Sequence, residues 1–189
     1  GRLCLYGPAG TGKTAYGRWL AEYLGKSLIL EKVSDLQSKY VGETEQNIAR
    51  AFERAQEAGA VLMIDEVDSF LQDRRNATRS WETTQVNEML TQIESYCGVL
   101  IVSTNLMDNL DPASLRRFDL KAKFDYLKPE QAVTLLCRCA EQLKLSTPNE
   151  RESRDIQQLK TLTPGDFATI MRQNRFRPMT RVAEIIGAL

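Results

Sequence analysis

Eight consecutive residues near the start of the chain have the composition and spacing of a loop that binds phosphate groups. They match the pattern GxxxxGK(S/T) and are Gly7, Pro8, Ala9, Gly10, Thr11, Gly12, Lys13 and Thr14. Glycines let the backbone wrap closely around an anion, so that N–H groups and the N-terminus of a following helix face its oxygens. We expect Lys13 to contact the β- and γ-phosphates of a nucleotide and the Thr14 hydroxyl to ligate Mg²⁺. A plain glycine-rich turn between a strand and a helix is the alternative interpretation.

Polar groups also follow two apolar runs that are typical of buried parallel strands, at 60–64 and 99–104. Asp65 and Glu66 would then lie at the carboxyl edge of a sheet, where open α/β sheets bind ligands. There Asp65 would hold Mg²⁺ through its water shell, and Glu66 would orient and polarise the attacking water. Asn105 would reach the same edge, where a neutral amide can bridge this water and the γ-phosphate. By residue type alone, these groups could instead begin ordinary turns.

The composition narrows the chemistry further. The 189 residues include no histidine, which excludes imidazole bases, histidine metal ligands and Ser-His or Cys-His nucleophiles. The four cysteines form no CxxC pair, so neither a zinc ribbon nor a thioredoxin-like motif is present. Lys and Arg number 25, as do Asp and Glu, which argues against binding to nucleic acid through net basic charge. No apolar run approaches the length of a membrane span.

Strand and helix patterns alternate over the first two thirds of the chain. Short apolar runs predict five strands, at 3–6, 27–33, 60–64, 99–104 and within 120–124. Beyond them only helical patterns occur, at 133–140, 156–162, 167–174 and from 180 onward. The sequence therefore predicts a five-strand α/β domain at 1–127, followed by a small all-helical domain at 128–189.

The two ends of the chain suggest a piece of a longer protein. The chain starts at Gly1, without a methionine, directly on a strand-like segment, and it ends in a helical pattern without a stop signal. We therefore expect flanking segments, and targeting information can lie in them. Three cysteines in apolar runs favour a reducing compartment, and we expect the cytoplasm.

Six segments together make the chain resemble the central module of an AAA ATPase, of the classical clade within the AAA+ group. They are GPAGTGKT at 7–14, SKYVGETEQNIARAF at 38–52, VLMIDEVDSF at 61–70, IVSTN at 101–105, LDPASLRRFD at 110–119 and TPGDFATI at 163–170. The resemblance implies an αβα P-loop NTPase domain with a five-stranded parallel sheet and a helical lid. It also implies Mg²⁺-dependent ATP hydrolysis at subunit interfaces of a ring that is usually hexameric. Lys13 and Thr14 match Walker A, Asp65 and Glu66 match Walker B, and Asn105 matches sensor 1.

Two further groups of residues take a role from this resemblance. Arg116 and Arg117 match the arginine-finger region, where a neighbouring subunit's guanidinium can neutralise charge that develops on the γ-phosphate. Lys39, Tyr40 and Val41 match the first pore loop, which would grip a polypeptide client. Local roles stay open for both groups. The arginines could pair with surface carboxylates or cap a short helix, and the tyrosine could fold onto its own domain.

The chain departs from the family pattern in three places. Arg116 and Arg117 adjoin without the Pro-Gly spacer of many members, which resembles the microtubule-severing and endosomal-sorting branch and leaves open which arginine is the finger. The segment 163–166 resembles the clade's Ser-Gly-Ala-Asp, where the arginine sensor of other AAA+ proteins is absent, so Arg172 has no assigned role. The stretch that precedes the family's first strand and helps to hold adenine is missing.

The sequence favours an ATP-dependent, protein-remodelling motor that assembles with itself and acts on a polypeptide client. A nucleotide-gated scaffold that turns over little ATP is the first alternative. A DNA-handling AAA+ motor is disfavoured by the neutral net charge and by the aromatic, rather than basic, pore loop. A GTPase is disfavoured because no Asn-Lys-x-Asp motif follows the fourth strand. The arginine-rich stretch 72–80 could be a second pore loop or a solvated run of charge.

Overall fold

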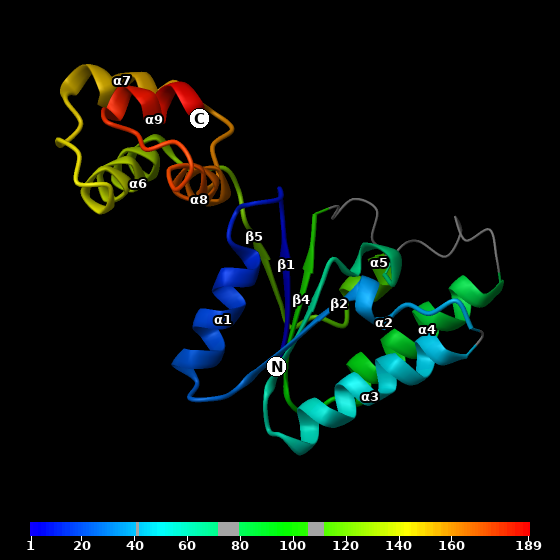
Figure 1. Ribbon diagram of the computed structural model, residues 1–189. Helices are drawn as coiled ribbons and strands as arrows, with labels where there is room; N and C mark the ends of the chain where they lie inside the picture. Colours follow the sequence, from blue (N-terminus) through cyan, green and yellow to red (C-terminus); the bar gives the residue numbers. More distant parts are fainter. Residues whose placement is uncertain (41, 72–79, 106–111) are drawn as a thin grey trace. The chain divides into compact units, whose positions relative to one another are not determined.

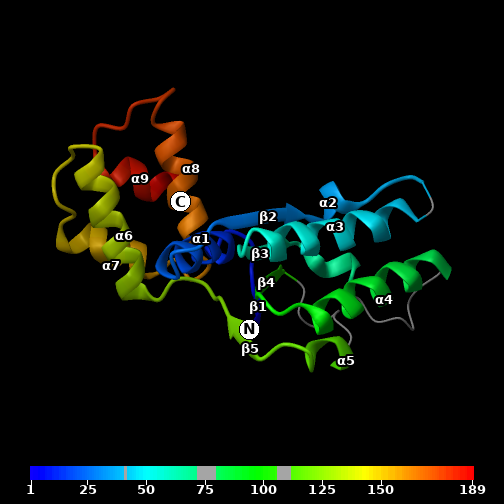
Figure 2. The ribbon, with the colours of Figure 1, turned by 90° about the horizontal axis from the view of Figure 1, so that it is seen from below.

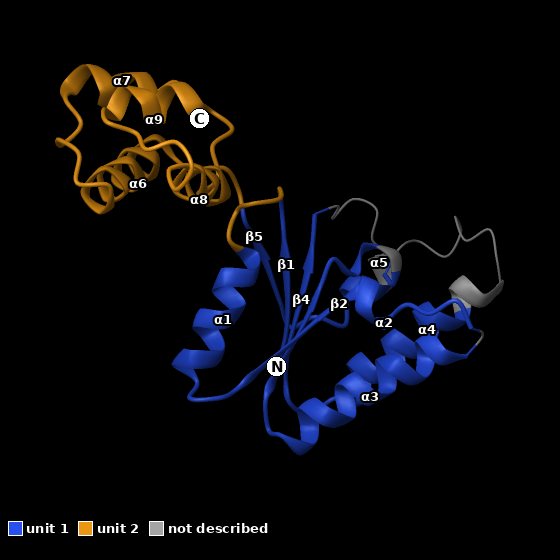
Figure 3. Ribbon diagram, in the orientation of Figure 1, with its two compact units in different colours: residues 1–7, 13–124 blue, residues 8–12, 125–189 orange. Residues whose placement is uncertain are grey.

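The computed structural model describes residues 1–40, 42–71, 80–105 and 112–189. These residues form two compact units, coloured separately in Figure 3. The first contains Gly1–Gly7 and Lys13–Phe124, and the second contains Pro8–Gly12 and Asp125–Leu189. Among the described residues, no helix has both the length and the apolar character needed to cross a membrane.

Five parallel strands form the sheet of the first unit, as predicted (Figure 1). They are β1 (Arg2–Tyr6), β2 (Leu28–Lys32), β3 (Val61–Asp65), β4 (Val99–Thr104) and β5 (Leu120–Lys123). Their order across the sheet is β2-β3-β4-β1-β5. Tyr6 pairs with Thr104, and Ile64 pairs with Val102, so that β1, β3 and β4 end at one edge. The segments that follow these three strands therefore start side by side.

Helices cover both faces of this sheet (Figures 1 and 2). One face carries α1 (Lys13–Tyr23), and the other carries α3 (Glu43–Glu57) and α4 (Ser80–Ser95). The shorter helical elements are α2 (Val33–Leu36), η1 (Val67–Ser69) and α5 (Pro112–Leu115). Alternate residues of a strand point to opposite faces, so Ile64 packs in the core beneath α3 and α4, while Met63 packs with Ala21 of α1. Both faces are apolar, which is why β3 reads as a continuous hydrophobic run.

The second unit is helical and has its own core. Its helices are α6 (Pro129–Gln142), α7 (Glu150–Gln157), α8 (Pro164–Gln173) and α9 (Val182–Ala188). Leu136, Ile156, Phe167 and Ile185, one from each helix, are buried together. The packing of four amphipathic helices around these side chains accounts for the apolar positions in the last third of the sequence.

The predicted helix at 156–162 is wrong in its placement. The observed α7 begins earlier, after Asn149, whose side chain accepts a hydrogen bond from the Glu152 N–H at 2.9 Å while the Glu152 carboxylate accepts from the Asn149 N–H. This capping box starts the helix, and the helix ends at Gln157. The apolar pattern was a poor guide here because Ile156 is the only buried residue of α7.

Candidate nucleotide-binding site

The loop that follows β1 has a backbone shape that requires glycine at several positions. Gly7, Gly10 and Gly12 have φ angles of 136°, 78° and 98°, which side-chain-bearing residues rarely adopt. A Cβ atom on Gly7 would lie 1.8 Å from the carbonyl oxygen of Phe124. Because α1 begins at Lys13, the loop runs directly into the N-terminus of a helix, which is the arrangement that binds phosphate. The structure thus explains the glycines of the motif by conformation.

The middle of this loop, Pro8–Gly12, belongs to the second unit. The Gly165 N–H, at the start of α8, donates to the Gly10 carbonyl oxygen at 2.9 Å. A Cβ atom on Gly10 would lie 2.7 Å from the Thr163 hydroxyl oxygen. Thr163 and Asp166 form the capping box of α8, so the segment that resembles the clade's Ser-Gly-Ala-Asp contacts Gly10 within the second unit through the start of a helix.

Lys13 lies at the carboxyl edge of the sheet and contacts the residue that follows β4. Its Nζ donates to the Gly7 carbonyl oxygen at 2.7 Å and to Asn105 Oδ1 at 2.8 Å. Only 7% of the lysine is exposed. Burial lowers the pKa of its ammonium group, and the nearby carboxylates, Asp65 foremost, act in the opposite direction. The structure therefore brings Lys13, which is predicted to contact the β- and γ-phosphates, into contact with Asn105, which is predicted to bridge the attacking water and the γ-phosphate.

Thr14 contacts the first acidic residue after β3. Its hydroxyl donates to Asp65 Oδ2 at 2.8 Å. Hydroxyl and carboxylate oxygens suit Mg²⁺, which keeps several water and phosphate oxygens among its ligands rather than filling an all-protein cage. No group of three or more Cys, Asp or Glu side chains that could hold a metal occurs in the described part of the chain. The Thr14–Asp65 pair thus fits a magnesium ion that is shared with a nucleotide.

Glu66 is exposed and has an uncommon backbone conformation. Its φ and ψ angles are 62° and 45°, in the left-handed region, where a non-glycine residue is destabilised by roughly 1–2 kcal/mol. This conformation turns the chain out of β3 and into η1. Glu66 adjoins Asp65 in the chain, and its side chain is accessible to water. A base that polarises a water molecule must have this access.

Sequence reasoning missed two hydroxyl groups at the end of β4. Ser103 Oγ donates to Asp65 Oδ1 and accepts a hydrogen bond from the Glu66 N–H at 3.4 Å. Thr104 Oγ1 donates to Asp68 Oδ1. Both hydroxyl residues are buried. The available signal in the sequence was that an otherwise apolar strand ends in two polar residues. The acidic residues that could pair with them follow another apolar strand.

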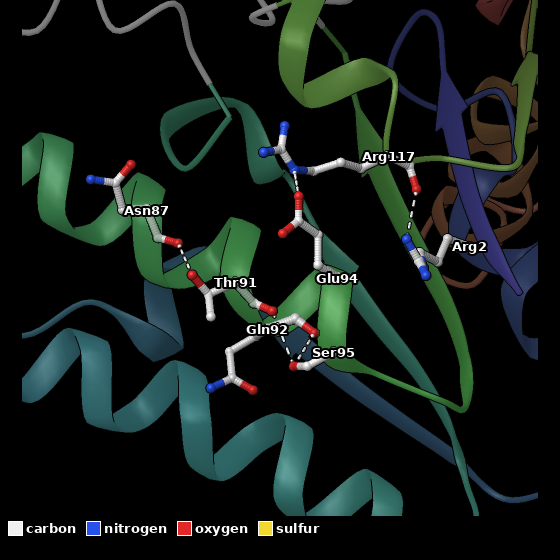
Figure 4. A network of polar contacts seen from close by, with 7 residues as sticks. All are labelled: Arg2, Asn87, Thr91, Gln92, Glu94, Ser95 and Arg117. Carbon is white, nitrogen blue, oxygen red and sulfur yellow. Dashed lines mark hydrogen bonds and ion pairs between the residues drawn. The ribbon is translucent and has the colours of Figure 1, made fainter.

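Arg117 belongs to a polar network within its own chain (Figure 4). Its Nε donates to Glu94 of α4 at 2.5 Å, and its carbonyl oxygen accepts a hydrogen bond from the Arg2 guanidinium at 3.3 Å. Arg116 is exposed, and its side chain has no hydrogen-bond or ion-pair partner within the described residues. The two adjacent arginines are thus in different surroundings.

The described part of the predicted pore loop lies between α2 and α3. Lys39 and Tyr40 are exposed, with 77% of the tyrosine accessible. The Tyr40 N–H donates to the Ser38 hydroxyl at 3.2 Å, which holds the backbone while the ring stays in solvent. Val41 and most of the arginine-rich stretch, 72–79, lie outside the described residues. The aromatic side chain at the centre of the predicted loop is therefore not folded onto its own unit.

Comparisons with known proteins place the sequence in a family. Residues 3–126 match the family described as "ATPase family associated with various cellular activities (AAA)". The chain is 38% identical over 124 residues to "Protein SAV" of Sulfolobus acidocaldarius, over 62% of this chain and 16% of that protein. It is 36% identical over 149 residues to "AAA ATPase forming ring-shaped complexes" of Bifidobacterium animalis subsp. lactis, over 70% of this chain and 28% of that protein. The chain thus spans less than a third of either relative.

The fold is also similar to a solved structure. The crystal structure of the FIGL-1 AAA domain in complex with ADP has a TM-score of 0.78 to this chain, with 22% sequence identity. The similarity covers 99% of this chain and 70% of that one. Because the family match extends over most of the sheet-forming unit, and includes the phosphate loop, both acidic residues and the amide after β4, this chain belongs to the AAA family.

Proposed function

We propose that this chain is the ATP-hydrolysing module of a ring-shaped, hexameric motor that remodels polypeptides. In this proposal, 1–127 is the nucleotide domain and 128–189 is a helical lid. The observation that carries the proposal is the pair of contacts between Thr14 and Asp65 and between Lys13 and Asn105. These side chains supply a cation for phosphate oxygens, oxygen ligands for a metal ion, and an amide for water. Phosphoryl hydrolysis needs this set, and the AAA family match supports ATP as the nucleotide.

In the proposed reaction, each group acts on a different part of the triphosphate. Lys13 gives up its hydrogen bonds to the neutral oxygens of Gly7 and Asn105 and donates to the β- and γ-phosphates instead. Hydrogen bonds to these charged oxygens are stronger. Glu66 polarises the attacking water, and Asn105 orients it toward the γ-phosphate. When bound, Mg²⁺ would neutralise part of the negative charge of the triphosphate, and Thr14 and Asp65 are the protein groups that would hold it. The strand ends keep these groups in place before the nucleotide arrives.

We assign the arginine finger to Arg116. Its exposed side chain is available to a second copy of the chain, whereas Arg117 is bound to Glu94 within its own unit. A finger stabilises negative charge on the γ-phosphate only if its guanidinium can reach an adjacent site. Arg117 would then hold the segment from which Arg116 projects. The ring-forming Bifidobacterium relative supports an assembly in which one copy completes the site of another.

The proposed client is a polypeptide held in the centre of the ring by Lys39, Tyr40 and Val41. An exposed aromatic ring on a loop can pack between the side chains of an extended chain with little regard to their identity. Gly42, with a φ angle of 83°, separates this loop from α3 and lets the loop leave the helix sharply.

Replacing Tyr40 with alanine should uncouple ATP turnover from work on the client. We expect unfolding of a tagged test protein by the full-length assembly to slow about tenfold, as for the loss of one aromatic anchor. ATP turnover should stay near the wild-type rate because Tyr40 lies outside the nucleotide site. Tyr23→Ala is the matched control, since Tyr23 is 74% exposed on α1. Equal slowing by both variants would contradict the gripping role.

Turnover measured against protein concentration tests the motor proposal as a whole. Phosphate release per chain of the full-length protein should rise steeply with concentration, because an active site needs a neighbour's guanidinium. Lys13→Ala should lower ATP affinity roughly 10- to 100-fold by removing a charged hydrogen bond. A folded, assembled protein that binds ATP but releases no phosphate would be a scaffold, and turnover stimulated only by DNA would identify a DNA-handling motor.

A further inference from the structure

The Ser103 hydroxyl lies between the two acidic residues of the proposed site. Ser103 is near the end of β4, beside β3, and only 1% of it is exposed. Its Oγ donates to Asp65 Oδ1, and the same oxygen accepts a hydrogen bond from the Glu66 N–H. A single side chain thus contacts the proposed metal-holding carboxylate and the backbone of the proposed base.

Both carboxylate oxygens of Asp65 are engaged. Ser103 binds Oδ1, and Thr14 binds Oδ2 at 2.8 Å. With a donor on each oxygen, the plane of the carboxylate is set from two sides, and one of the donors is the hydroxyl that would also ligate Mg²⁺. Without the serine hydroxyl, Asp65 could rotate about its side-chain bonds and lose the orientation that a small octahedral ion demands.

The contact with Glu66 concerns its backbone. Glu66 has a left-handed conformation with a φ angle of 62°, which persists in a non-glycine residue only where the surroundings hold it. The Ser103 oxygen is an acceptor for the N–H group of this residue. The direction in which the chain leaves β3, and with it the starting point of the Glu66 side chain, is tied to the same hydroxyl that orients Asp65.

We infer that Ser103 is a positioning residue for the proposed magnesium site, a role that rests on the proposed ATP-dependent function. It acts through Asp65, because its hydroxyl orients the Asp65 carboxylate. The same hydroxyl accepts a hydrogen bond from the Glu66 N–H and so holds the backbone of the next residue. Hydrogen-bond partners of metal ligands commonly change metal affinity or activity by about 10- to 100-fold when removed. If Ser103 served only to pack in the buried strand, an alanine would fill its place equally well.

The test compares ATP affinity with and without magnesium in the full-length protein. A fluorescent ATP analogue is titrated in Mg²⁺ and in EDTA, and the ratio of the two dissociation constants measures the magnesium-dependent gain. We expect Ser103→Ala to reduce this ratio about tenfold and to leave the affinity in EDTA unchanged. The Mg²⁺ concentration for half-maximal turnover should rise by a similar factor.

Two further variants separate hydrogen bonding from packing. Ser103→Cys keeps the approximate size of the side chain but is a weak donor, so it should behave like the alanine variant. Thr104→Val removes the neighbouring buried hydroxyl, which donates to Asp68 Oδ1, and should leave the ratio unchanged. Thermal unfolding identifies any variant that has lost its fold, and the cysteine variant serves if the alanine variant is unstable.

The outcomes distinguish this role from the proposed function. A wild-type ratio in both Ser103→Ala and Ser103→Cys would overturn the positioning role alone. A ratio that falls equally in Thr104→Val would also overturn it, because the effect would then belong to the strand end in general. No magnesium-dependent gain in the wild-type protein would overturn the proposed function together with this role.

Discussion

Replacing Glu66 with glutamine should nearly abolish ATP turnover and leave ATP bound. Loss of a general base lowers rates by roughly 10²- to 10⁴-fold, and glutamine preserves the size of the side chain while it removes the charge that polarises water. ATP affinity should be unchanged within error because Glu66 does not belong to the phosphate loop or to the Thr14–Asp65 pair. Phosphate release and equilibrium binding, measured on the same preparation of the full-length protein, give the two numbers.

Glu57→Gln is the control for this experiment. Glu57 is exposed at the end of α3, away from the sheet edge that carries Glu66, so its replacement removes one surface charge and nothing else. Turnover by Glu66→Gln at the rate of this control would remove Glu66 from the reaction. Loss of ATP binding in Glu66→Gln would show instead that the residue supports the pocket.

Replacing Arg116 with alanine should lower turnover about 10³-fold, the lower end of the range for a missing arginine finger. Arg117→Ala should have a much smaller effect, because Arg117 is a quarter exposed and its ion pair with Glu94 is partly solvated, where such pairs contribute about 0.2–1 kcal/mol. Glu94→Gln breaks the same pair from the other side and should match Arg117→Ala. A larger loss in Arg117→Ala than in Arg116→Ala would reverse the assignment.

Mixed assemblies show directly whether the guanidinium acts on a neighbour. Arg116→Ala and Glu66→Gln chains are each expected to be inactive alone. When they are mixed, some interfaces combine a chain that retains Glu66 with a neighbour that retains Arg116, and these interfaces should hydrolyse ATP. Verified mixing without recovery of turnover would place the arginine's action within its own chain.

The strands of the core could be predicted from the sequence because burial on both faces leaves a clear pattern. The run expected at 99–104 coincides with β4, and the run expected at 60–64 differs from β3 by one residue at each end. A parallel strand that is covered by helices on both faces must be apolar at nearly every position. Its burial is therefore visible in the sequence as a continuous apolar run. The order of the strands has no comparable local signal.

The contacts of Ser103 could not be predicted, because they depend on which strands are neighbours in the sheet. Its partners Asp65 and Glu66 are distant in sequence, and only the pairing of β3 with β4 brings them within hydrogen-bonding distance. A serine at the end of a strand is also an ordinary residue in an ordinary place. The Arg117–Glu94 pair has the same origin, since α4 and the segment after α5 become neighbours only in the folded chain.

The pairing of β5 with β1 has a mechanical consequence. The Arg116 segment leads into β5, and the Asp119 N–H and the Phe124 N–H, on either side of that strand, donate to the backbone of β1 at 2.9 Å and 2.7 Å. Gly7 directly follows β1, and its backbone lies so close to Phe124 that a Cβ atom on Gly7 would be 1.8 Å from the Phe124 carbonyl oxygen. In the proposed ring, a force that an adjoining copy exerts on Arg116 would therefore pass through these paired backbones to Gly7, the first residue of the phosphate loop.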